Sequence, residues 1–158
     1  MIKVAKLPIT VSWRSARAIL IDEDDHLVLI KRTKPGTAPY WTAPGGGLEP
    51  EDPSPEAAMR RELVEELGAE AGPALQVCFF SSLDGDRVAT QYFFLTRLRK
   101  LNEEARTGPE FKDPSRGGYE IDRVGLRGDD LVEVDLKPTA LRDFVLANRV
   151  ALLAEITG

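Results

Sequence analysis

The sequence predicts a single α/β domain over residues 1–158, in which strands and helices surround one core. Short apolar, β-rich segments alternate with two segments of helical period. The chain has 158 residues, of which 42% are hydrophobic and 30% charged. This length and composition suit one soluble globular domain with a sizeable core. No internal repeat, linker or low-complexity segment divides the chain.

Charge and cysteine content exclude several classes of protein. With 21 basic and 26 acidic residues the net charge is −5, which argues against nucleic-acid binding because such proteins usually carry a basic surplus. Cys78 is the only cysteine, so no internal disulfide forms, as expected in a reducing compartment. His26 is the only histidine, which excludes His-rich zinc sites. We find neither a signal peptide nor a membrane-length apolar segment, so we expect a cytoplasmic protein without a membrane partner.

The first elements are predicted strands. Residues Arg17–Ile21 and His26–Ile30 are apolar and β-rich, and the acidic run Asp22–Asp25 between them indicates a hairpin turn. Pro and Gly make Lys34–Pro39 a loop, and Tyr40–Ala43 follows as a short strand. The three glycines after Pro44 give the main chain conformations that other residues avoid.

A helix is predicted from Pro55 to Leu67. Ser54 precedes it and has the side chain of an N-cap, while proline fits the first helical position. Gly68 follows Leu67, and glycine commonly ends a helix.

Two further strands are expected, at Leu75–Ser82 and Arg87–Leu98, with Asp84-Gly85 as their hairpin turn. Residues Lys100–Gly118 have no convincing period. A loop of this length is either functional or a surface excursion, and the sequence favours neither.

The C-terminal part carries one more strand, near Tyr119–Leu126, and a helix from about Pro138 to Glu155. The apolar positions of this helix are Leu141, Val145, Leu146, Val150, Leu152 and Leu153. Cys78, in an apolar run, is expected to be a small buried residue.

The first predicted helix carries three carboxylates on one side. At about 100° per residue, Glu62, Glu65 and Glu66 fall within roughly 100° of arc. Met59 and Leu63 lie on the adjoining side and are expected to face a core. Neighbouring carboxylates repel one another, and a hard divalent cation relieves that repulsion. A solvated acidic face trimmed by Arg–Glu pairs is the alternative.

Together, these residues resemble the Nudix box, the signature of the Nudix (MutT-like) hydrolases. The family pattern is Gly, five residues, Glu, seven residues, then Arg-Glu-apolar-x-Glu-Glu-x-Gly-apolar. Gly47 takes its first position, and Arg61–Ala69 fits the second half without a gap. The resemblance extends from about Ala16 to the C-terminal helix.

The sequence departs from the family pattern at one position. Pro53 stands where the pattern has its first glutamate, which in the family helps to hold the loop and supports the metal ligands. Asp52 or Glu51 is expected to substitute if the loop is shifted by a residue.

The resemblance implies a role for each matching residue. Glu62, Glu65 and Glu66 would bind Mg²⁺ or Mn²⁺, together with a carbonyl of Gly46 or Gly47. Arg61 would orient the glutamates.

A further carboxylate outside the box would serve the metal or act as general base. Glu120 is the first candidate and Asp122, on the same strand face, the second. An ordinary exposed strand carboxylate is the alternative for Glu120.

The resemblance also implies fold and reaction: the Nudix α/β/α sandwich with a mixed sheet, and hydrolysis of the diphosphate linkage of a nucleoside diphosphate derivative. Dimers are common in the family, so a homodimer is possible. A Nudix-fold nucleotide-binding or regulatory module with little catalysis is the alternative, favoured by Pro53.

Substrate contacts are expected from Arg32, Lys34, Arg97 and Arg99 for phosphate, and from Tyr40, Trp41 and Tyr92 for stacking. Solvated or core positions are the alternative for each.

Overall fold

The computed structural model describes residues 10–157. Its elements are β1 (Thr10–Ile21), β2 (His26–Lys34), β3 (Thr37–Thr42), β4 (Gly45–Gly47), α1 (Pro55–Leu67), β5 (Ala69–Asp84), β6 (Arg87–Leu101), β7 (Gly118–Gly125), β8 (Leu136–Lys137) and α2 (Thr139–Thr157). Between β6 and β7 the chain makes three short 3₁₀ turns. No helix in the described part of the chain is long and apolar enough to cross a membrane.

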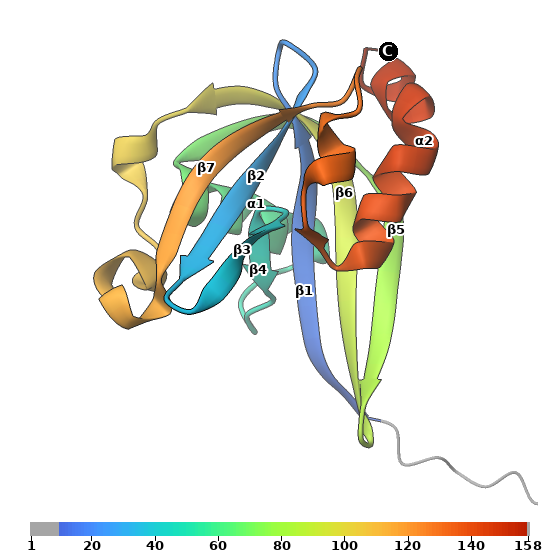
Figure 1. Cartoon of the computed structure of the whole chain (residues 1–158). Coiled ribbons are helices and arrows are strands. Elements are labelled where there is room, and N and C mark those ends of the chain that lie inside the picture. Colours follow the sequence, from blue (N-terminus) through green and yellow to red (C-terminus); the bar gives the residue numbers. More distant parts are fainter. Residues whose placement is uncertain (1–9, 158) are drawn as a thin grey trace, which may run out of the picture.

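The strands form one mixed sheet, as predicted (Figure 1). Its main path runs β5-β6-β1-β2-β3-β8, while β4 pairs with β1 and β7 with β2. The pairs β1–β6 and β3–β8 are parallel, and the other pairs are antiparallel. β1 and β2 pair at their turn, where Ile21 faces Leu27. Beyond that point each strand has other partners, so the sheet splays and β4 enters beside β1.

Each helix packs its own core against the sheet. The cluster under α1 contains Met59, Leu63 and Leu67 with residues of β1 and β2, including Ala18 and Ile30. A second cluster, under α2, is built from other residues of the same strands. Because side chains alternate along a strand, one sheet supplies both cores. This arrangement is the α/β/α sandwich that the sequence predicted.

α1 has the predicted bounds. The Ser54 hydroxyl accepts a hydrogen bond from the Ala57 N–H at 3.1 Å, and Gly68 ends the helix in the left-handed region, at φ 61°. Gly68 donates its N–H to the carbonyls of Leu63 and Val64.

α2 begins and ends close to the predicted residues, but one of its apolar positions was misjudged. Leu141 and Val145 are buried, whereas Val150 is 79% exposed. Nine residues at about 100° each place Val150 on the side of the helix opposite Leu141.

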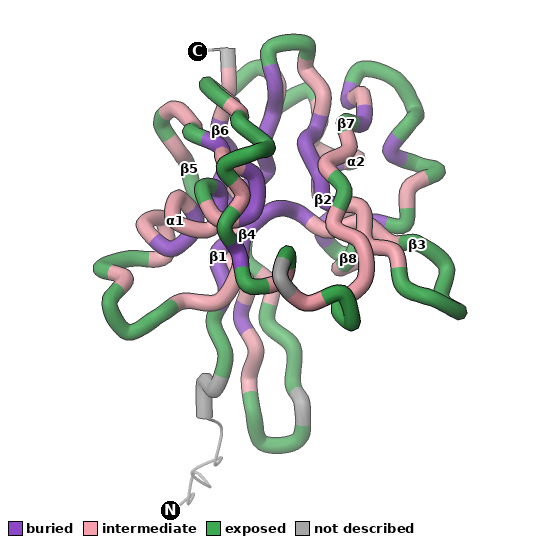
Figure 2. The backbone as a smooth tube through the Cα atoms, turned by 90° about the vertical axis from the view of Figure 1, so that its left-hand side faces the viewer, coloured by how far each residue is buried: buried purple, intermediate pink, exposed green. Residues whose placement is uncertain are grey.

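Several strand boundaries differ from the prediction: β1 already begins at Thr10 rather than Arg17, β2 continues to Lys34 rather than Ile30, and β3 and β5 also start earlier than expected. The expected loop Lys34–Pro39 is a tight turn at Pro35-Gly36, after which β3 begins at Thr37. β5 begins at Ala69, six residues before the expected start, because register shifts on both sides of Ala71 accommodate Gly72 and Pro73 within the strand. β5 and β6 consequently form a long hairpin whose far end extends beyond both helices (Figures 1 and 2).

Cys78 lies on this hairpin and is half-buried rather than fully buried. Burial raises the pKa of its thiol to about 11. The side chain packs against the α2 cluster, in keeping with the predicted role as a small apolar residue.

Candidate active site

The three glycines of β4 bring the main chain against the glutamates of α1. Gly46 faces Ala16 of β1, and a Cβ at Gly46 would lie 2.6 Å from the carboxyl carbon of Glu62. Gly45 has φ 149° and donates its N–H to Glu66 Oε1 at 2.6 Å. Glycine is therefore required at Gly45, where φ is positive and a Cβ would collide with the Ala16 carbonyl oxygen, while a side chain at Gly46 would displace the Glu62 carboxylate.

Arg61 holds two of the glutamates and the loop before α1. Its Nη1 donates to Glu62 Oε1 at 3.0 Å and to Glu65 Oε2 at 3.3 Å, and its Nη2 donates to the Gly47 carbonyl at 3.1 Å. These contacts place the guanidinium between the helix and β4. Hydrogen bonds that Arg61 donates to the Asp52 and Glu62 carboxylates raise the pKa of Arg61, so its charge is fixed.

Asp52, the residue before Pro53, is paired with Arg61. Its two carboxylate oxygens accept hydrogen bonds from Arg61 Nε and Nη2 at 3.1 and 2.9 Å. Asp52 also accepts the Glu49 N–H at 2.8 Å, and these bonds hold its pKa below the usual range. Of the two substitutes considered for Pro53, Asp52 is the one that contacts Arg61, whereas Glu51 is exposed.

Glu66 is a buried carboxylate and Glu62 a half-buried one, and neither has enough donors to balance its charge. Glu66 is 7% exposed. Burial raises its pKa to about 8 although Gly45 donates to it and Arg17 lies close enough to lower it. Burial also raises the pKa of Glu62, against the opposing effect of Arg61. Both sites therefore favour an added positive charge, either a proton or a cation.

The Glu62, Glu65 and Glu66 oxygens do not converge on one point. Glu62 and Glu65 turn to Arg61, and Glu66 turns to Gly45. Among the described residues, the His, Cys, Asp and Glu side chains whose ligand atoms all lie within 4.8 Å are Asp22, Asp24 and His26, at the β1–β2 turn.

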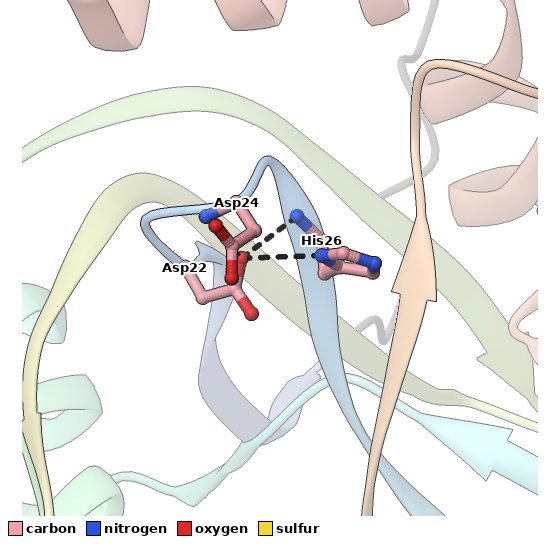
Figure 3. Close-up of side chains that lie close together, drawn as sticks. All are labelled: Asp22, Asp24 and His26. Carbon is pink, nitrogen blue, oxygen red and sulfur yellow. Dashed lines mark hydrogen bonds and ion pairs between the residues drawn. The ribbon is translucent and has the colours of Figure 1, made fainter.

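That turn cluster is already saturated by hydrogen-bond donors (Figure 3). Asp22 Oδ1 accepts the N–H groups of Asp24 and His26 at 2.9 Å, and its Oδ2 accepts from Arg123 at 2.8 Å. Burial alone would raise the pKa of Asp22, but these bonds outweigh it and keep the pKa below its usual range. The cluster closes the hairpin, as the sequence predicted, and has little need of a cation.

Glu120 is not brought to the α1 glutamates. Its neighbours Tyr119 and Ile121 pack into the α1 cluster, so the alternation of β7 directs Glu120 to the other face of the sheet. Asp122 shares that face and accepts a hydrogen bond from Trp41 Nε1 at 2.8 Å.

Glu110, which the sequence reasoning missed, lies within electrostatic reach of the site. Its charge contributes to the raised pKa of both Glu62 and Glu66. Glu110 belongs to the segment between β6 and β7. The available signal was the length of that loop, which left a functional role and a surface excursion equally open and indicated no residue.

The segment carrying Glu110 is fastened to the end of α1. Arg106 donates to the carbonyls of Glu66 and Tyr119, both at 2.6 Å, and its guanidinium lies 4.0 Å from the ring centre of Phe111. The N–H groups of Thr107 and Gly108 donate to the Glu65 carbonyl. The helix end thus fixes the loop beside the glutamates.

The predicted substrate contacts are dispersed. Arg97 donates to the Asp22 carbonyl and pairs with Asp25 at the β1–β2 turn, so it is committed there. Arg32 stacks on Tyr119 at 3.7 Å and donates to the Gly118 carbonyl.

The remaining candidates are divided between the two faces and the edge of the sheet. Lys34 is exposed at the end of β2, and Trp41 lies on the α2 face, where Lys31 approaches its ring. Tyr40 lies near Arg32 and Lys137. Tyr92 packs with Phe79, and Arg99 is exposed beside Gly72.

Comparisons with known proteins show which sequences and folds this chain resembles. Residues 11–122 match the family model described as NUDIX domain. A Bacillus subtilis (strain 168) protein named "Putative 8-oxo-dGTP diphosphatase" is 33% identical over 64 residues, which is 40% of each chain. The crystal structure of a MutT NUDIX hydrolase from Burkholderia pseudomallei is 26% identical, with a TM-score of 0.58 over 89% of this chain and 95% of that one. A structure titled "Crystal structure of ADP compounds hydrolase", 22% identical, aligns with a TM-score of 0.66 over 92% of this chain and 72% of that one.

Proposed function

The chain belongs to the NUDIX family, and on that premise we propose that it is a hydrolase of phosphoanhydride bonds that cleaves the diphosphate linkage of a nucleoside diphosphate derivative. One observation carries the proposal: the half-buried Glu62 and the buried Glu66 lie against the β4 main chain, and desolvation raises the pKa of both. Carboxylates that are shielded from water and lack compensating positive charge destabilise a fold, so their presence indicates a functional site.

The donor set fits a hard divalent cation, Mg²⁺ or Mn²⁺. Glu62, Glu65 and Glu66 offer carboxylate oxygens, and Gly46 or Gly47 a carbonyl, which are the ligands that such ions prefer. The bound ion would polarise phosphoryl oxygens and lower the pKa of a bound water. Arg61 would keep Glu62 and Glu65 oriented when substrate enters.

Glu110 is the proposed general base, in preference to Glu120. A base must come within hydrogen-bond reach of the attacking water. Glu110 is on a loop fixed to the end of α1, within electrostatic reach of Glu62 and Glu66. Glu120 belongs to the opposite face of the sheet. We therefore expect Glu110→Gln to lower kcat by about 10²–10⁴-fold, the effect of losing a general base, and Glu120→Gln to leave kcat nearly unchanged.

Two relatives suggest which compounds to test first. The Bacillus subtilis protein is named for 8-oxo-dGTP and one structural neighbour for ADP compounds. The decisive experiment measures release of monophosphate or inorganic phosphate from 8-oxo-dGTP, ADP-ribose and other ADP-linked compounds, with Mg²⁺ and with Mn²⁺. Arg32 and Lys34 remain proposed phosphate contacts, and Trp41 a proposed base contact; Arg97 is withdrawn because it is paired at the turn.

A binding or regulatory module without catalysis is the second candidate, because Pro53 replaces a family glutamate. Asp52 weakens this alternative, since the loop before α1 still supplies a carboxylate to Arg61. Tight binding of a compound of the panel, without turnover in either metal, would establish the binding module and contradict the hydrolase.

A further inference from the structure

We propose that Gly108 and Arg106 are positioning residues that hold the carboxylate of Glu110 beside the end of α1. Gly108 leaves the space that the carboxylate occupies, and Arg106 fastens the segment that carries it, residues 102–117. Their role rests on the proposed function, in which Glu110 is the general base.

The carboxylate of Glu110 lies against the α-carbon of Gly108. A Cβ at Gly108 would lie 2.5 Å from the carboxyl carbon of Glu110 and would also overlap its oxygens. The backbone there has φ −58° and ψ 146°, a conformation open to any residue. Backbone freedom is therefore not what glycine supplies at this position. What a side chain would displace is the Glu110 carboxylate.

The main chain of Gly108 is fixed to α1. Its N–H and that of Thr107 donate to the Glu65 carbonyl at 3.1 and 2.9 Å. The last carbonyls of a helix have no partner within it, so α1 offers this acceptor to the segment. Glu110 consequently begins two residues from a main-chain contact with the helix that carries the candidate metal ligands.

Arg106 ties the same segment to α1 and to β7 at once. Its Nε donates to the Glu66 carbonyl and its Nη2 to the Tyr119 carbonyl, both at 2.6 Å, and its side chain is 12% exposed. The donors of a guanidinium lie in one plane at fixed angles, whereas those of a lysine share one nitrogen on a flexible stem. Arginine is therefore suited to bridge two carbonyls from different elements.

Phe111 extends this anchor to the residue that follows Glu110. The Arg106 guanidinium lies 4.0 Å from the centre of its ring, and the Tyr119 ring meets it edge-on, with 5.8 Å between ring centres. Cation–aromatic and edge-to-face contacts are both favourable. Glu110 is thus held from both sides, through Gly108 before it and Phe111 after it.

Gly108→Ala tests the space for the carboxylate. Alanine suits the backbone conformation at this position, so the melting temperature should be unchanged or higher. Because the new Cβ displaces the Glu110 carboxylate, kcat should fall by about 10²-fold, the effect of misplacing a catalytic group by about 1 Å, while KM is nearly unchanged. Gly128→Ala is the matched control and should behave as wild type, because a Cβ at Gly128 meets nothing within 4 Å.

A double-mutant cycle separates positioning from a general structural role. If Gly108 acts through Glu110, Gly108→Ala should cause no further loss of kcat in the Glu110→Gln background. Equal losses in both backgrounds, or full activity of Gly108→Ala in an active enzyme, would overturn the role of Gly108 and leave the hydrolase proposal intact.

Hydrogen exchange without substrate or metal tests the role of Arg106. Arg106→Ala loses both carbonyl contacts, so the Thr107 and Gly108 amides should exchange at least about tenfold faster. In Gly108→Ala the Thr107 amide should keep its protection. Unchanged exchange in Arg106→Ala would overturn the role of Arg106. A wild-type protein that turns over no compound of the panel would overturn both the hydrolase and the catalytic use of Glu110, whatever the exchange rates.

Discussion

Two clusters of carboxylates in this protein each contain one buried member, and the pKa values of these two members are shifted in opposite directions. Asp22, at the β1–β2 turn, is 2% exposed, and hydrogen bonds keep its pKa below the usual range. Glu66, on α1, is 7% exposed, and burial raises its pKa to about 8. Asp22 accepts two backbone N–H groups and the Arg123 guanidinium, whereas Gly45 donates to Glu66.

The difference shows that the supply of donors, rather than burial or acidity, distinguishes a structural cluster from a candidate site. At the turn, Asp22 is paired with Arg123, and Asp25 with Arg97 and Arg127. The α1 cluster shares its arginine among Glu62, Glu65 and Asp52, and within residues 10–157 Glu66 has no ion pair. Compact acidic geometry alone would have selected the turn, although its buried carboxylate, Asp22, is already supplied with donors.

Glu66→Gln should have the largest effect on turnover. Glutamine keeps an acceptor for the Gly45 N–H but loses the charge that the cation requires, so we expect kcat to fall by about 10²–10³-fold, in line with the loss of one preorganised electrostatic group. The melting temperature of the metal-free protein should be unchanged or higher. Asp24→Asn, an exposed carboxylate of the turn, is the control and should retain activity. Full activity in Glu66→Gln would exclude Glu66 from the site.

The two clusters should respond to pH in opposite directions. The pKa of Glu66 rises on folding from its usual 4.5 to about 8, so the stability contributed by its protonation is fully present below pH 4.5 and is lost as pH rises through 8. We expect the metal-free protein to lose on the order of 3 kcal/mol of unfolding free energy between pH 5 and 8. Denaturant titration should show this loss, and Mn²⁺ or Glu66→Gln should reduce it.

The pH dependence of the stability that Asp22 contributes has the opposite sign. Its pKa is lowered from 3.8, so its contribution is present above that value and is lost as pH falls below it. A stability profile that rises from pH 5 to pH 8 would contradict the assignment for Glu66.

Asp22→Ala should have the largest effect on stability away from the site. The substitution leaves the Asp24 and His26 N–H groups without their acceptor and removes the partner of Arg123, so we expect a loss of about 2–3 kcal/mol. Thermal unfolding should show a fall of roughly 5–10 °C for a chain of this size. At a temperature where the variant is folded, kcat should be normal. A reduced kcat there would show that the turn contributes to the reaction.

Asp52→Asn tests the smaller contribution of the residue that supports Arg61. We expect activity to fall by about 10–100-fold, the range for groups that orient ligands without binding the metal. Glu51→Ala is the matched control and should behave as wild type, because Glu51 is exposed. Equal activity of both variants would show that Arg61 keeps its orientation through Glu62 and Glu65 alone.

Local signals predicted α1 well. The Ser54 cap, Pro55 and Gly68 act within one or two turns, and Met59, Leu63 and Leu67 follow the helical period, so neighbouring residues are sufficient to define the helix. The same local reasoning failed for β5. It could not foresee that register shifts would carry a strand through Gly72 and Pro73, because a bulge depends on the strand opposite.

The sequence by itself determined α1, the spacing of its glutamates from Gly47, and the membership of the NUDIX family, because each of these depends on residues that are close together in the chain. Only the tertiary structure decided which carboxylates serve the candidate site. Asp52 reaches Arg61, Glu110 is brought to α1 by its loop, and Glu120 is turned to the other face by the pleat of β7. These outcomes depend on contacts between residues far apart in the chain, and pairing and packing, rather than local preference, fix them.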